Sequence, residues 1–391
     1  MKTRFLATMS HDIRTPLNGI IGMVNMENQY ADDSQMQQKI REKAMEALKY
    51  LVSLVNDVLD MNKLQSGDLK DQQLLFDLTM VLRELNQIYD ERAAKKSIRY
   101  EIDWKNGTYS HSALVGNPVY LGRILSNVMD NAIKFSQAGS VITVWVEEET
   151  LDDGRAIFTF YCKDQGVGMS EDFIAHAFDM FSQESKTSRS RYEGTGLGLA
   201  ITKQLVDRMG GAIELKSEVG VGTTVVVKIP FKIGTQDKNS NLSDKPVSLD
   251  DYSVEGMRAL VVEDNELNME ISRCILEDSG MEVTCAVDGQ EAVEIFEKSA
   301  PDYFGVIYMD IMMPRMNGLD AARTIREMKR RDARRVPIIA MSANSFAEDI
   351  INSRLAGMNV HLAKPLDAEK MIVALKQCMA DNSDVKLHED L

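Results

Sequence analysis

The 391-residue sequence predicts a multidomain protein that combines an α-helical part with two α/β parts. Three observations carry this prediction. Residues 1–68 show helical periodicity with almost no strand signal, residues 73–232 mix strand and helix patterns, and residues 257–380 alternate five short apolar runs with helix-like stretches. Residues 233–256, rich in Asn, Ser and Asp, have the composition of a linker, and residues 381–391 are too few for another domain.

Composition is that of a soluble globular protein. Hydrophobic residues make up 44% and charged residues 27%, which excludes disordered and low-complexity classes. The formal net charge of −15 argues against a nucleic-acid partner. No run of about 18 apolar residues occurs, so we expect a cytoplasmic chain that reaches a membrane only through sequence outside these residues. The four cysteines lie far apart, without metal-ligand spacing, and are expected to be reduced.

Two amphipathic helices are expected in residues 1–68, on both sides of a polar break at Asp32–Ser34. The apolar stripes comprise Leu6, Ile13, Leu17, Ile20 and Val24, then Met36, Ile40, Ala44, Leu48, Leu51, Val55 and Leu59. Ser34 is the expected N-cap of the second helix and Gly67 its stop. Two helices alone bury too little apolar surface, so we expect this hairpin to form a homodimeric four-helix bundle.

Residues 73–232 are expected to fold as an α/β sandwich. The strand predictions are Ser97–Trp104, Val141–Glu148, Ala156–Lys163, Ala212–Lys216 and Thr223–Ile229, and the helix predictions are Val119–Phe135, Glu171–Phe178 and Leu197–Met209. In residues 257–380 the apolar runs are Ala259–Val262, Glu282–Ala286, Gly305–Met309, Ile338–Met341 and Val360–Ala363. Five strand-helix units of this size indicate a doubly wound parallel sheet, the (βα)5 arrangement.

The first candidate chemical site is His11 in the first helix. His11 lies two residues before Ile13, about 200° around the helix, so it faces away from the apolar stripe. An exposed imidazole can act as a nucleophile, and the carboxylate of Asp12 can orient one ring nitrogen while the other attacks. Pro16 removes an amide donor and should bend the helix beside the histidine. An isolated His-Asp pair is more often an ordinary pair of surface residues. The sequence around His11 therefore determines whether the pair is read as a functional site.

The second candidate site has the chemistry of a nucleotide pocket without a Walker lysine. Asn127 and Asn131 lie four residues apart and share one helix face, where two amide oxygens could approach a metal-phosphate. Residues 164–168 and 194–199 are glycine-rich, which lets backbone amides come close to phosphate. The second of these stretches opens a helix, and helix N-termini favour anions. Each of these short sequences alone is a weak signal, because such sequences more often mark a turn. Their occurrence together in one domain is a specific signal for a nucleotide site.

The third candidate site is a set of polar side chains at strand ends in the C-terminal part of the chain. Glu263 and Asp264 follow the first strand, Asp310 comes at the end of the third, Ser342 follows the fourth and Lys364 follows the fifth. The carboxyl ends of parallel strands share one edge of the sheet, so these side chains should converge. Crowded carboxylates favour a cation, and oxygen-only ligation suits Mg²⁺. Ser342 and Lys364 could then help to hold a phosphoryl group on Asp310.

Taken together, these strings resemble the sensor histidine kinases. Ser-His-Asp-Ile-Arg-Thr-Pro-Leu-Asn, at residues 10–18, looks like their H box. Four strings resemble the N, G1, F and G2 boxes of their ATP-binding domain, whose superfamily includes gyrase and MutL ATPases, at residues 127–135, 164–169, 178–181 and 194–199. The acids, serine and lysine of residues 257–380 resemble a response-regulator receiver domain. The whole resembles a hybrid sensor histidine kinase.

For the nucleotide site, the resemblance implies that Asp164 recognises the adenine amino group and that Lys134 meets the phosphates. Asn131 and Asn127 would hold Mg²⁺, and residues 183–193 would form a mobile lid. The remaining residues that the resemblance implies for nucleotide binding are Phe135, Gly166, Gly168, Arg191, Gly194, Thr195, Gly196, Leu197, Gly198 and Leu199.

For the two phosphoryl sites, the resemblance implies that His11 takes the γ-phosphate of ATP, that Asp12 is the general base, and that Thr15 helps to position water in a phosphatase reaction. The receiver would supply a phospho-acceptor, Asp310; a Mg²⁺ site, Glu263 and Asp264 with Asp310; a switch hydroxyl, Ser342; and a phosphate-binding lysine, Lys364. The sequence departs from the receiver pattern at His361, where many receivers carry Tyr or Phe as a rotameric switch.

The sequence thus predicts an ATP-dependent protein-histidine kinase. With ATP and Mg²⁺ as cofactors, His11 would be phosphorylated and would pass the phosphoryl group to Asp310 in a two-component phosphorelay. Expected partners are a second copy, through the hairpin, and a separate histidine-phosphotransfer protein or response regulator. Two alternatives stay open: a nucleotide-binding scaffold or net phosphatase with weak kinase activity, and an ATP hydrolase of the gyrase-like superfamily. The other histidines, His111, His176 and His388, are expected at the surface.

Overall fold

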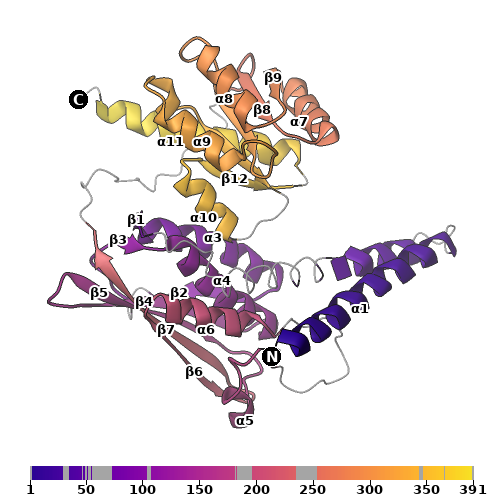
Figure 1. The fold of residues 1–391 in the computed structure, drawn as a ribbon, viewed down its shortest axis with the longest axis vertical. Helices are drawn as coiled ribbons and strands as arrows, with labels where there is room; N and C mark the ends of the chain where they lie inside the picture. Colours follow the sequence, from indigo (N-terminus) through magenta and orange to yellow (C-terminus); the bar gives the residue numbers. More distant parts are fainter. Residues whose placement is uncertain are drawn as a thin grey trace. The chain divides into compact units, whose positions relative to one another are not determined.

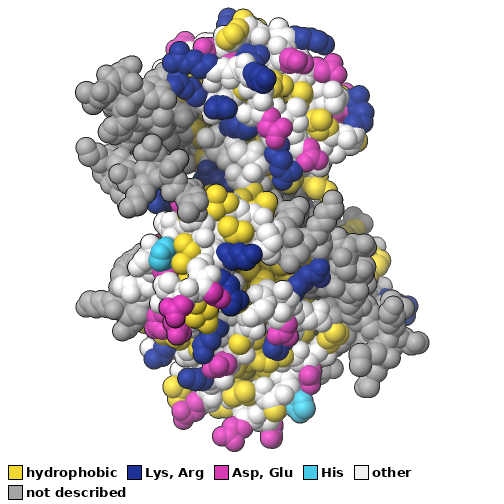
Figure 2. All heavy atoms as spheres, turned by 60° about the vertical axis from the view of Figure 1, so that its left-hand side comes forward, with side chains coloured by type: hydrophobic (Ala, Val, Ile, Leu, Met, Phe, Trp, Pro, Cys, Tyr) yellow, Lys and Arg dark blue, Asp and Glu magenta, His cyan; other side chains and the backbone are white. Residues whose placement is uncertain are grey.

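The computed structural model of the protein describes residues 2–29, 35–45, 47, 48, 51, 54, 73–103, 107–180, 182, 196–234, 253–342, 347–364 and 366–389. The chain divides into two compact units, Met1–Thr235 and Gln236–Leu391, which are described separately (Figure 1). Within the described residues, no helix has both the length and the apolar character needed to cross a bilayer. Acidic and basic side chains are interspersed on the face of the described residues that Figure 2 shows.

Helix α1 (Lys2–Gln29) confirms the first helix of the predicted hairpin. It continues through Pro16, which is buried. The large apolar side chains of α1 that are exposed in the single chain include Leu17 by 43%, Ile21 by 52% and Val24 by 53%. Their spacing of four and three residues places them on one helix face, which therefore presents an apolar stripe to its surroundings.

The second predicted helix of the hairpin is helical wherever the structure describes it, at residues 35–45, 47, 48, 51 and 54. Its buried apolar residues, Ile40, Ala47 and Leu54, have helical spacing. Met45 and Leu48 are 53% and 44% exposed, so this helix also carries apolar side chains that the single chain leaves uncovered. Ser34 and Gly67, the expected ends of this helix, lie outside the described residues.

Seven strands of the first unit form one mixed sheet with the order β1-β3-β7-β5-β4-β2, and β6 pairs with β7. The pair β2 and β4 is parallel and the other pairs are antiparallel. The strands are β1 (Leu74–Asp77), β2 (Arg99–Ile102), β3 (Ala113–Gly116), β4 (Val141–Thr150), β5 (Arg155–Asp164), β6 (Ala212–Glu218) and β7 (Gly222–Ile233). In β5 every second residue from Ala156 to Asp164 is buried, so one face of the strand lies in the core.

The other helices described in this unit are α3 (Leu78–Lys95), α4 (Pro118–Phe135), α5 (Glu171–Ile174) and α6 (Gly198–Arg208). Asp77 caps α3 by accepting a hydrogen bond from the backbone N–H of Thr79, and Asn117 caps α4 in the same way at Tyr120. Helix α6 begins differently, because its N-cap residue, Leu197, has no side-chain acceptor for the first-turn N–H groups.

The strands predicted for the first unit are confirmed with shifted ends, and β1, α3 and β3 are additional to the prediction. Ile233, which composition assigns to the linker, is the last residue of β7 and pairs with Leu114. The helix predicted over residues 171–178 is shorter, since α5 ends at Ile174. A turn follows it, in which the backbone N–H of Asp179 donates to the carbonyl of His176.

The second unit confirms the predicted doubly wound parallel sheet, with the strand order β12-β11-β10-β8-β9. Its strands are β8 (Arg258–Val262), β9 (Glu282–Ala286), β10 (Val306–Asp310), β11 (Ile338–Ser342) and β12 (Val360–Ala363). Its helices are α7 (Glu266–Asp278), α8 (Gly289–Lys298), α9 (Gly318–Glu327), the 3-10 helix η2 (Asp332–Arg334), α10 (Ala347–Leu355) and α11 (Ala368–Glu389). The strand order reverses between β8 and β10, which creates a crevice at the carboxyl ends of those strands.

Two arginines hold the opposite end of this sheet, where the strands begin. Arg326 donates hydrogen bonds to the carbonyls of Ala333 and Gly357 and to the side chain of Asn359, at 2.8, 2.8 and 2.9 Å. Burial lowers the pKa of Arg326 to about 10. Arg330 donates to Asp332 and to carbonyls of the loop before β10. These contacts link the segments that enter β10, β11 and β12.

Candidate functional site

Asp164 is the last residue of β5 and is only 7% exposed. Its Oδ1 atom accepts hydrogen bonds from the backbone N–H groups of Gly166, at 2.8 Å, and Thr223, at 3.1 Å. Burial raises the pKa of Asp164, and the two backbone hydrogen bonds offset only part of that rise. The carboxyl group is therefore held in one orientation and binds a proton more readily than an ordinary aspartate.

Glycines let the chain around Asp164 pack closely. Gly168 has a φ of +70°, and a Cβ atom added there would lie 1.9 Å from the carbonyl oxygen of Glu218. Gly222 has a φ of +133°, and a Cβ atom there would lie 2.1 Å from the carbonyl oxygen of Asp164. Both contacts are far shorter than packing allows, so the loop after β5 and the turn between β6 and β7 need these glycines. Gly168 thus has a packing role besides any contact with nucleotide.

Asn127 on α4 connects that helix to the start of α6. Its Nδ2 atom donates to the carbonyl of Gly198 at 3.3 Å and to Oγ1 of Thr202 at 3.2 Å. Thr202 is fully buried, and its hydroxyl donates to the same carbonyl at 2.8 Å. These contacts engage the amide nitrogen of Asn127, so its amide oxygen is the atom that could ligate a cation. Asn131 lies one turn further along the same face of α4 and is half-buried.

The N-terminus of α6 has the properties of an anion site. The first residue, Gly198, would place a Cβ atom in open space, with nothing within 4 Å. Gly196 has a φ of +68°, Leu197 is fully buried and Leu199 is half-buried. The buried Leu197 therefore anchors the segment, and the N–H groups at the start of α6 form the positive end of the helix dipole.

Lys134 and Phe135 come at the end of α4. The ammonium nitrogen of Lys134 lies 4.5 Å from the centre of the Phe135 ring, which is a cation-π contact. The carbonyl of Phe135 accepts a hydrogen bond from Val167, next to Gly166 and Gly168. Three other expected nucleotide-binding residues, Arg191, Gly194 and Thr195, and the expected lid at residues 183–193 lie outside the described residues.

The expected phosphoryl-accepting histidine lies on α1. The backbone of His11 and Asp12 is helical, and their side chains lie outside the described part of the structure. Thr15, one turn after His11, is exposed. The helix therefore carries these three residues as the sequence predicts, and their roles remain predictions.

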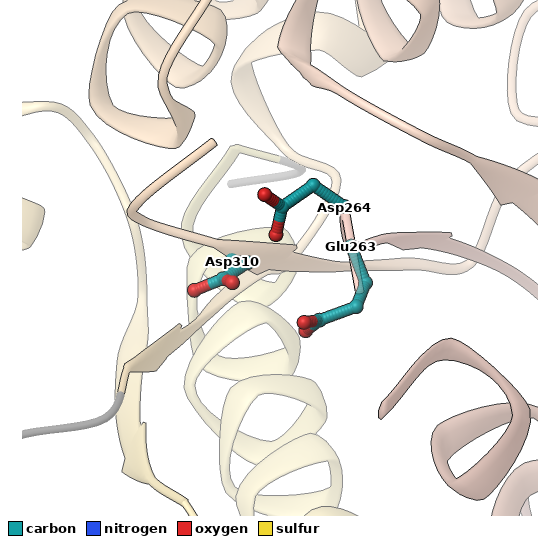
Figure 3. Close-up of side chains that lie close together, drawn as sticks. All are labelled: Glu263, Asp264 and Asp310. Atoms are coloured by element: carbon teal, nitrogen blue, oxygen red, sulfur yellow. The ribbon is translucent and has the colours of Figure 1, made fainter. Parts of the chain in front are cut away.

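The carboxylates predicted to converge in the second unit do so. Oxygen atoms of Glu263, Asp264 and Asp310 lie within 4.8 Å of one another. Figure 3 shows these side chains at the carboxyl ends of the neighbouring strands β8 and β10. Glu263 and Asp310 are 1% and 6% exposed, whereas Asp264 is exposed. Three oxygen donors of this kind, two of them buried, fit a hard divalent cation such as Mg²⁺.

Lys364 completes this cluster. Its Nζ atom lies 2.6 Å from Oε2 of Glu263 and 2.8 Å from Oδ2 of Asp310. Burial by itself lowers the pKa of Lys364, but hydrogen bonds and charge attraction from Asp310 and Glu263 outweigh it, so the pKa is raised. Asn268 on α7 donates to the other oxygen of Glu263 at 2.9 Å. The lysine is thus held as a cation between two buried carboxylates.

Ser342 ends β11 and is 5% exposed, beside the acidic cluster in the sheet. Its Oγ atom lies 2.8 Å from Nε2 of His361 on β12. Lys364 thus contacts both Glu263 and Asp310, whereas Ser342 contacts His361. His361, the residue at which the sequence departs from the usual receiver pattern, therefore has Ser342 as a hydrogen-bond partner.

Two of the remaining histidines are described with their side chains. His176, with its side chain 69% exposed, pairs with Asp179 and is a surface residue as expected. His111 is not a plain surface residue, because its ring contacts the buried carboxylate of Glu148. Burial raises the pKa of Glu148, but hydrogen bonds from His111 and from backbone N–H groups outweigh it and leave that pKa lowered. The side chain of His388 lies outside the described part.

Four residues that contact the site were not predicted. Thr223 reaches Asp164 because β5 and β7 are neighbours, and Ser217 binds both Met169 and Thr223. Thr202 accepts a hydrogen bond from Asn127, and Asn268 donates one to Glu263. Asn268 could have been found, because a polar residue in the first turn of α7 points back toward the end of β8. The other three depend on strand register and helix packing.

Three protein-family models match the chain in succession. The His Kinase A (phospho-acceptor) domain matches residues 1–67. The histidine kinase-, DNA gyrase B- and HSP90-like ATPase matches residues 116–233, and the response regulator receiver domain matches residues 259–376. The models fall on the helical hairpin, on the mixed sheet with its helices, and on the parallel sheet.

Curated relatives align with nearly the whole chain. The sensory/regulatory protein RpfC of Xanthomonas campestris pv. campestris is 30% identical over 395 residues, 96% of this chain and 54% of the relative. The autoinducer 2 sensor kinase/phosphatase LuxQ of Vibrio vulnificus is 31% identical over 373 residues, 95% and 42%. The sensor histidine kinase AruS of Pseudomonas aeruginosa is 32% identical over 374 residues, 96% and 36%. The chain spans 54% or less of the length of these relatives.

These findings confirm the family expected from the sequence. The three matched domains occur in the expected order, and the α/β units have the expected architecture. In the parallel sheet, the side chains of Glu263, Asp264, Asp310 and Lys364 converge as expected from their positions after the strands. The chain belongs to the hybrid sensor histidine kinases.

Proposed function

We propose that the chain phosphorylates itself on His11 from ATP and passes the phosphoryl group to Asp310 in a two-component phosphorelay. The observation that carries this proposal is the pairing of the Asp310 carboxylate with Lys364 beside Glu263, in the same chain as an ATPase domain and a histidine-bearing helix. A carboxylate that only stabilised the fold would not need two further acids at its side, because like charges raise the free energy of the cluster.

The first transfer forms a phosphohistidine. A nitrogen of the His11 imidazole attacks the γ-phosphorus of ATP, so that an N–P bond forms and the bond to the bridging oxygen breaks to release ADP. Asp12 accepts the proton that the imidazole loses. In the competing phosphatase reaction, Thr15 positions a water molecule. The exposure of Thr15 on α1 supports this role, because the water must reach it.

ATP binds between α4, the loop after β5 and the start of α6. Asp164 accepts a hydrogen bond from the adenine amino group, since its Oδ1 atom is already held by backbone N–H groups and its orientation is set. Asn131 and Asn127 present amide oxygens to Mg²⁺, and Lys134 meets the phosphates. The open space at Gly198 supports phosphate binding at the N-terminus of α6, because no described atom lies within 4 Å of a Cβ atom placed there. Phe135, Gly166, Gly168, Arg191 and residues 194–199 complete the pocket.

The second transfer uses the receiver cluster. A carboxylate oxygen of Asp310 attacks the phosphorus on His11, an O–P bond forms, the N–P bond breaks, and the imidazole regains a proton. Glu263, Asp264 and Asp310 hold Mg²⁺, which neutralises charge on the phosphoryl oxygens when bound. The single cation Lys364 balances only part of the charge of three carboxylates, which supports a divalent ion there. Lys364 and Ser342 then bind phosphoryl oxygens.

The chain works as a homodimer through the hairpin. The exposed stripe of Leu17, Ile21 and Val24 on α1 supports this, because such a stripe is normally covered by another helix. A separate histidine-phosphotransfer protein or response regulator accepts the phosphoryl group downstream. Purified candidate partners that fail to remove label from Asp310 would argue against this last step. The cytoplasmic location also stays a prediction.

The alternative of a scaffold or net phosphatase is less favoured, because the sequence retains His11, Asp12, Asn131 and Asp164, and backbone N–H groups hold the Asp164 carboxylate. One relative, LuxQ, is named as a sensor kinase/phosphatase, which supports phosphatase activity as the second candidate function of this chain. A simple ATP hydrolase would release phosphate without labelled protein.

Labelling from γ-labelled ATP tests the proposal. The parent chain, His11→Gln and Asp310→Asn are incubated with Mg²⁺ and ATP, and the protein label is tested in acid and in alkali. A phosphohistidine is labile in acid and stable in alkali. We expect such a label in Asp310→Asn and none in His11→Gln. Label in His11→Gln would contradict the donor, and a nucleotide-binding chain without label in any form would favour the scaffold.

A further inference from the structure

His361 connects the candidate switch hydroxyl of Ser342 to helix α10. The Nε2 atom of His361 lies 2.8 Å from Oγ of Ser342, and its Nδ1 atom lies 3.4 Å from Oγ of Ser353. Ser342 and Ser353 are 5% and 1% exposed. A hydrogen-bonded chain of three side chains therefore runs from the sheet edge beside Asp310 to α10. The path is largely shielded from solvent, so the donors and acceptors along it have to match.

The direction of each hydrogen bond follows from Ser353. Its hydroxyl donates to the carbonyl of Ile350 at 2.8 Å, and a hydroxyl has only one proton. Toward Nδ1 of His361, the Ser353 oxygen can therefore only accept, so Nδ1 carries a proton. In a neutral imidazole the other nitrogen is then an acceptor. It follows that Ser342 donates its hydroxyl proton to Nε2 of His361.

A phosphoryl group on Asp310 changes this arrangement. Phosphoryl oxygens only accept hydrogen bonds, so Ser342 has to turn its single proton away from His361 to bind one. With a neutral ring, the lone pair of Nε2 would then face the lone pairs of the Ser342 oxygen. With a protonated ring, Nε2–H donates to the Ser342 oxygen while the Ser342 proton points to the phosphoryl group. The protonated ring therefore keeps its hydrogen bond to Ser342 while Ser342 donates to the phosphoryl group.

We propose that His361 takes up one proton when Asp310 is phosphorylated, and that this proton positions the Ser342 hydroxyl on the phosphoryl group. The inference rests on the proposed function, in which Asp310 is the acceptor. The proton comes from solvent and returns to it on dephosphorylation. His361 acts through Ser342 and is a positioning residue.

The elements next to the ring carry few charged side chains among the residues described. Helix α10 contributes Asp349, which is one turn before Ser353 on the same helix face, and Arg354. Lys364 follows β12. The side chains that α11 contributes to the hydrophobic core on the other face of β12, next to Leu362, are Met371, Ala374, Leu375 and Cys378. Histidine changes its charge between about pH 5 and 8, so a favourable phosphoryl group nearby can hold the proton at physiological pH.

Proton uptake can be measured directly. The full chain carrying His11→Gln, which cannot label itself from ATP, is titrated with beryllium fluoride and Mg²⁺ as a phosphoryl mimic on Asp310. Calorimetry in two buffers of different ionisation enthalpy gives the number of protons bound. His361→Gln is the test variant, because the amide can donate and accept but does not change charge. His176→Gln is the matched control, with a side chain 69% exposed in the other unit.

We expect the parent and the control to take up a fraction approaching one proton near pH 7 and the test variant to take up markedly less. Binding of the mimic should strengthen up to about tenfold per pH unit as the pH falls through this range, and more weakly in His361→Gln. Equal proton uptake in parent and test variant would overturn the inference. Absence of binding in every form would instead refute Asp310 as the acceptor.

A second measurement covers the case in which His361→Gln does not fold. The imidazole nitrogen resonances of the 15N-histidine-labelled chain distinguish the two neutral tautomers and the charged ring. We expect the His361 signals to show a proton on Nδ1 alone before the mimic binds and protons on both nitrogens afterwards. A ring that stays neutral in the bound state would refute the inference.

Discussion

Lys364 is the residue on which the receiver cluster depends before a metal or phosphoryl group binds. It is the cation paired with both Glu263 and Asp310, whose side chains are 1% and 8% exposed. Because the pKa of Lys364 is raised in the folded state, its stabilisation is fully present below the unfolded pKa. It is lost only at alkaline pH, as the pH rises through the folded value. At neutral pH the lysine is therefore charged and in place.

Replacing this lysine should separate transfer from autophosphorylation. In Lys364→Met, the phosphoryl group loses a charged donor, so we expect transfer from His11 to Asp310 to slow by about 100-fold or more. Label on His11 should persist, because the change lies in the receiver. Lys370→Met, at a lysine with a side chain 62% exposed, is the control and should transfer normally. Normal transfer in Lys364→Met would show that the Lys364 contacts are structural only.

The raised pKa of Asp164 leads to a pH dependence of nucleotide binding. An acceptor for the adenine amino group has to be ionised to bind it strongly, and burial makes Asp164 take up a proton at a higher pH than an ordinary aspartate. We expect the affinity for ATP to fall on acidification, beginning above the range in which aspartates normally titrate. The free energy of unfolding should change in the opposite direction and rise on acidification, because burying the ionised carboxylate of Asp164 costs free energy in the folded state.

Equilibrium binding of a fluorescent ATP analogue across pH measures this effect. Asp164→Asn should bind weakly at every pH and lose the acidic transition, whereas Asp153→Asn, at an exposed carboxylate, should keep it. Protonation of the ATP phosphates affects all three proteins equally, so the comparison isolates Asp164. An identical acidic transition in Asp164→Asn would assign the titration to another group.

At the scale of elements, apolar patterning predicts the strands of the parallel sheet to within one residue at each end. The runs at Glu282–Ala286 and Val360–Ala363 match β9 and β12 residue for residue, because each lies between polar or glycine-containing turns. β1 and β3 have four residues each and gain their definition from pairing with each other. The sequence patterns of these two short strands carry little signal by themselves. Helix α3 was also not predicted, although the helical spacing of its buried residues is visible in the sequence.

The loop after β5 should be sensitive to a single methyl group. Gly168→Ala introduces a Cβ atom 1.9 Å from a backbone carbonyl at a φ of +70°, whereas Gly154→Ala meets a similar φ of +78° in open space. We expect Gly154→Ala to reduce the free energy of unfolding by about 1 kcal/mol and Gly168→Ala to reduce it by about 3 kcal/mol or more. Gly168→Ala should also weaken ATP binding.

Denaturant unfolding followed by tryptophan fluorescence gives this comparison, because both tryptophans of the chain, Trp104 and Trp145, lie in the first unit. Equal losses in the two variants would mean that the loop relaxes away from Glu218. The close approach described at Gly168 would then be unnecessary for stability.

At the scale of the whole molecule, the sequence was sufficient for the order of the domains and for most polar residues of the clusters. Motif residues at strand ends, such as Glu263 and Asp310, follow from the rule that these ends meet at one edge of a sheet. The contact between Thr223 and Asp164 could not be predicted, because it depends on the pairing of β5 with β7 across 59 residues of sequence. The pattern of residues within one strand does not show with which distant strand it pairs, or in what register.

Dimer formation should depend on the apolar stripe of α1. Placing a charge there, in Ile21→Asp, opposes burial of that face, so we expect the dimer dissociation constant to rise by about 30-fold or more. Analytical ultracentrifugation measures the change. Val219→Asp changes a residue that is 66% exposed near a turn and should leave the dimer intact. A dimer that tolerates Ile21→Asp would place the interface elsewhere.

The arginine contacts at the other end of the receiver sheet have a practical consequence. Arg326 and Arg330 tie together the segments that enter β10, β11 and β12, while Asp310, Ser342 and Lys364 lie where those strands end. We therefore expect structural changes at the proposed phosphoryl site not to extend to the far end of the sheet. A spectroscopic label near η2 would keep a constant signal through the phosphorylation cycle and could serve as an internal standard for a second label beside α10.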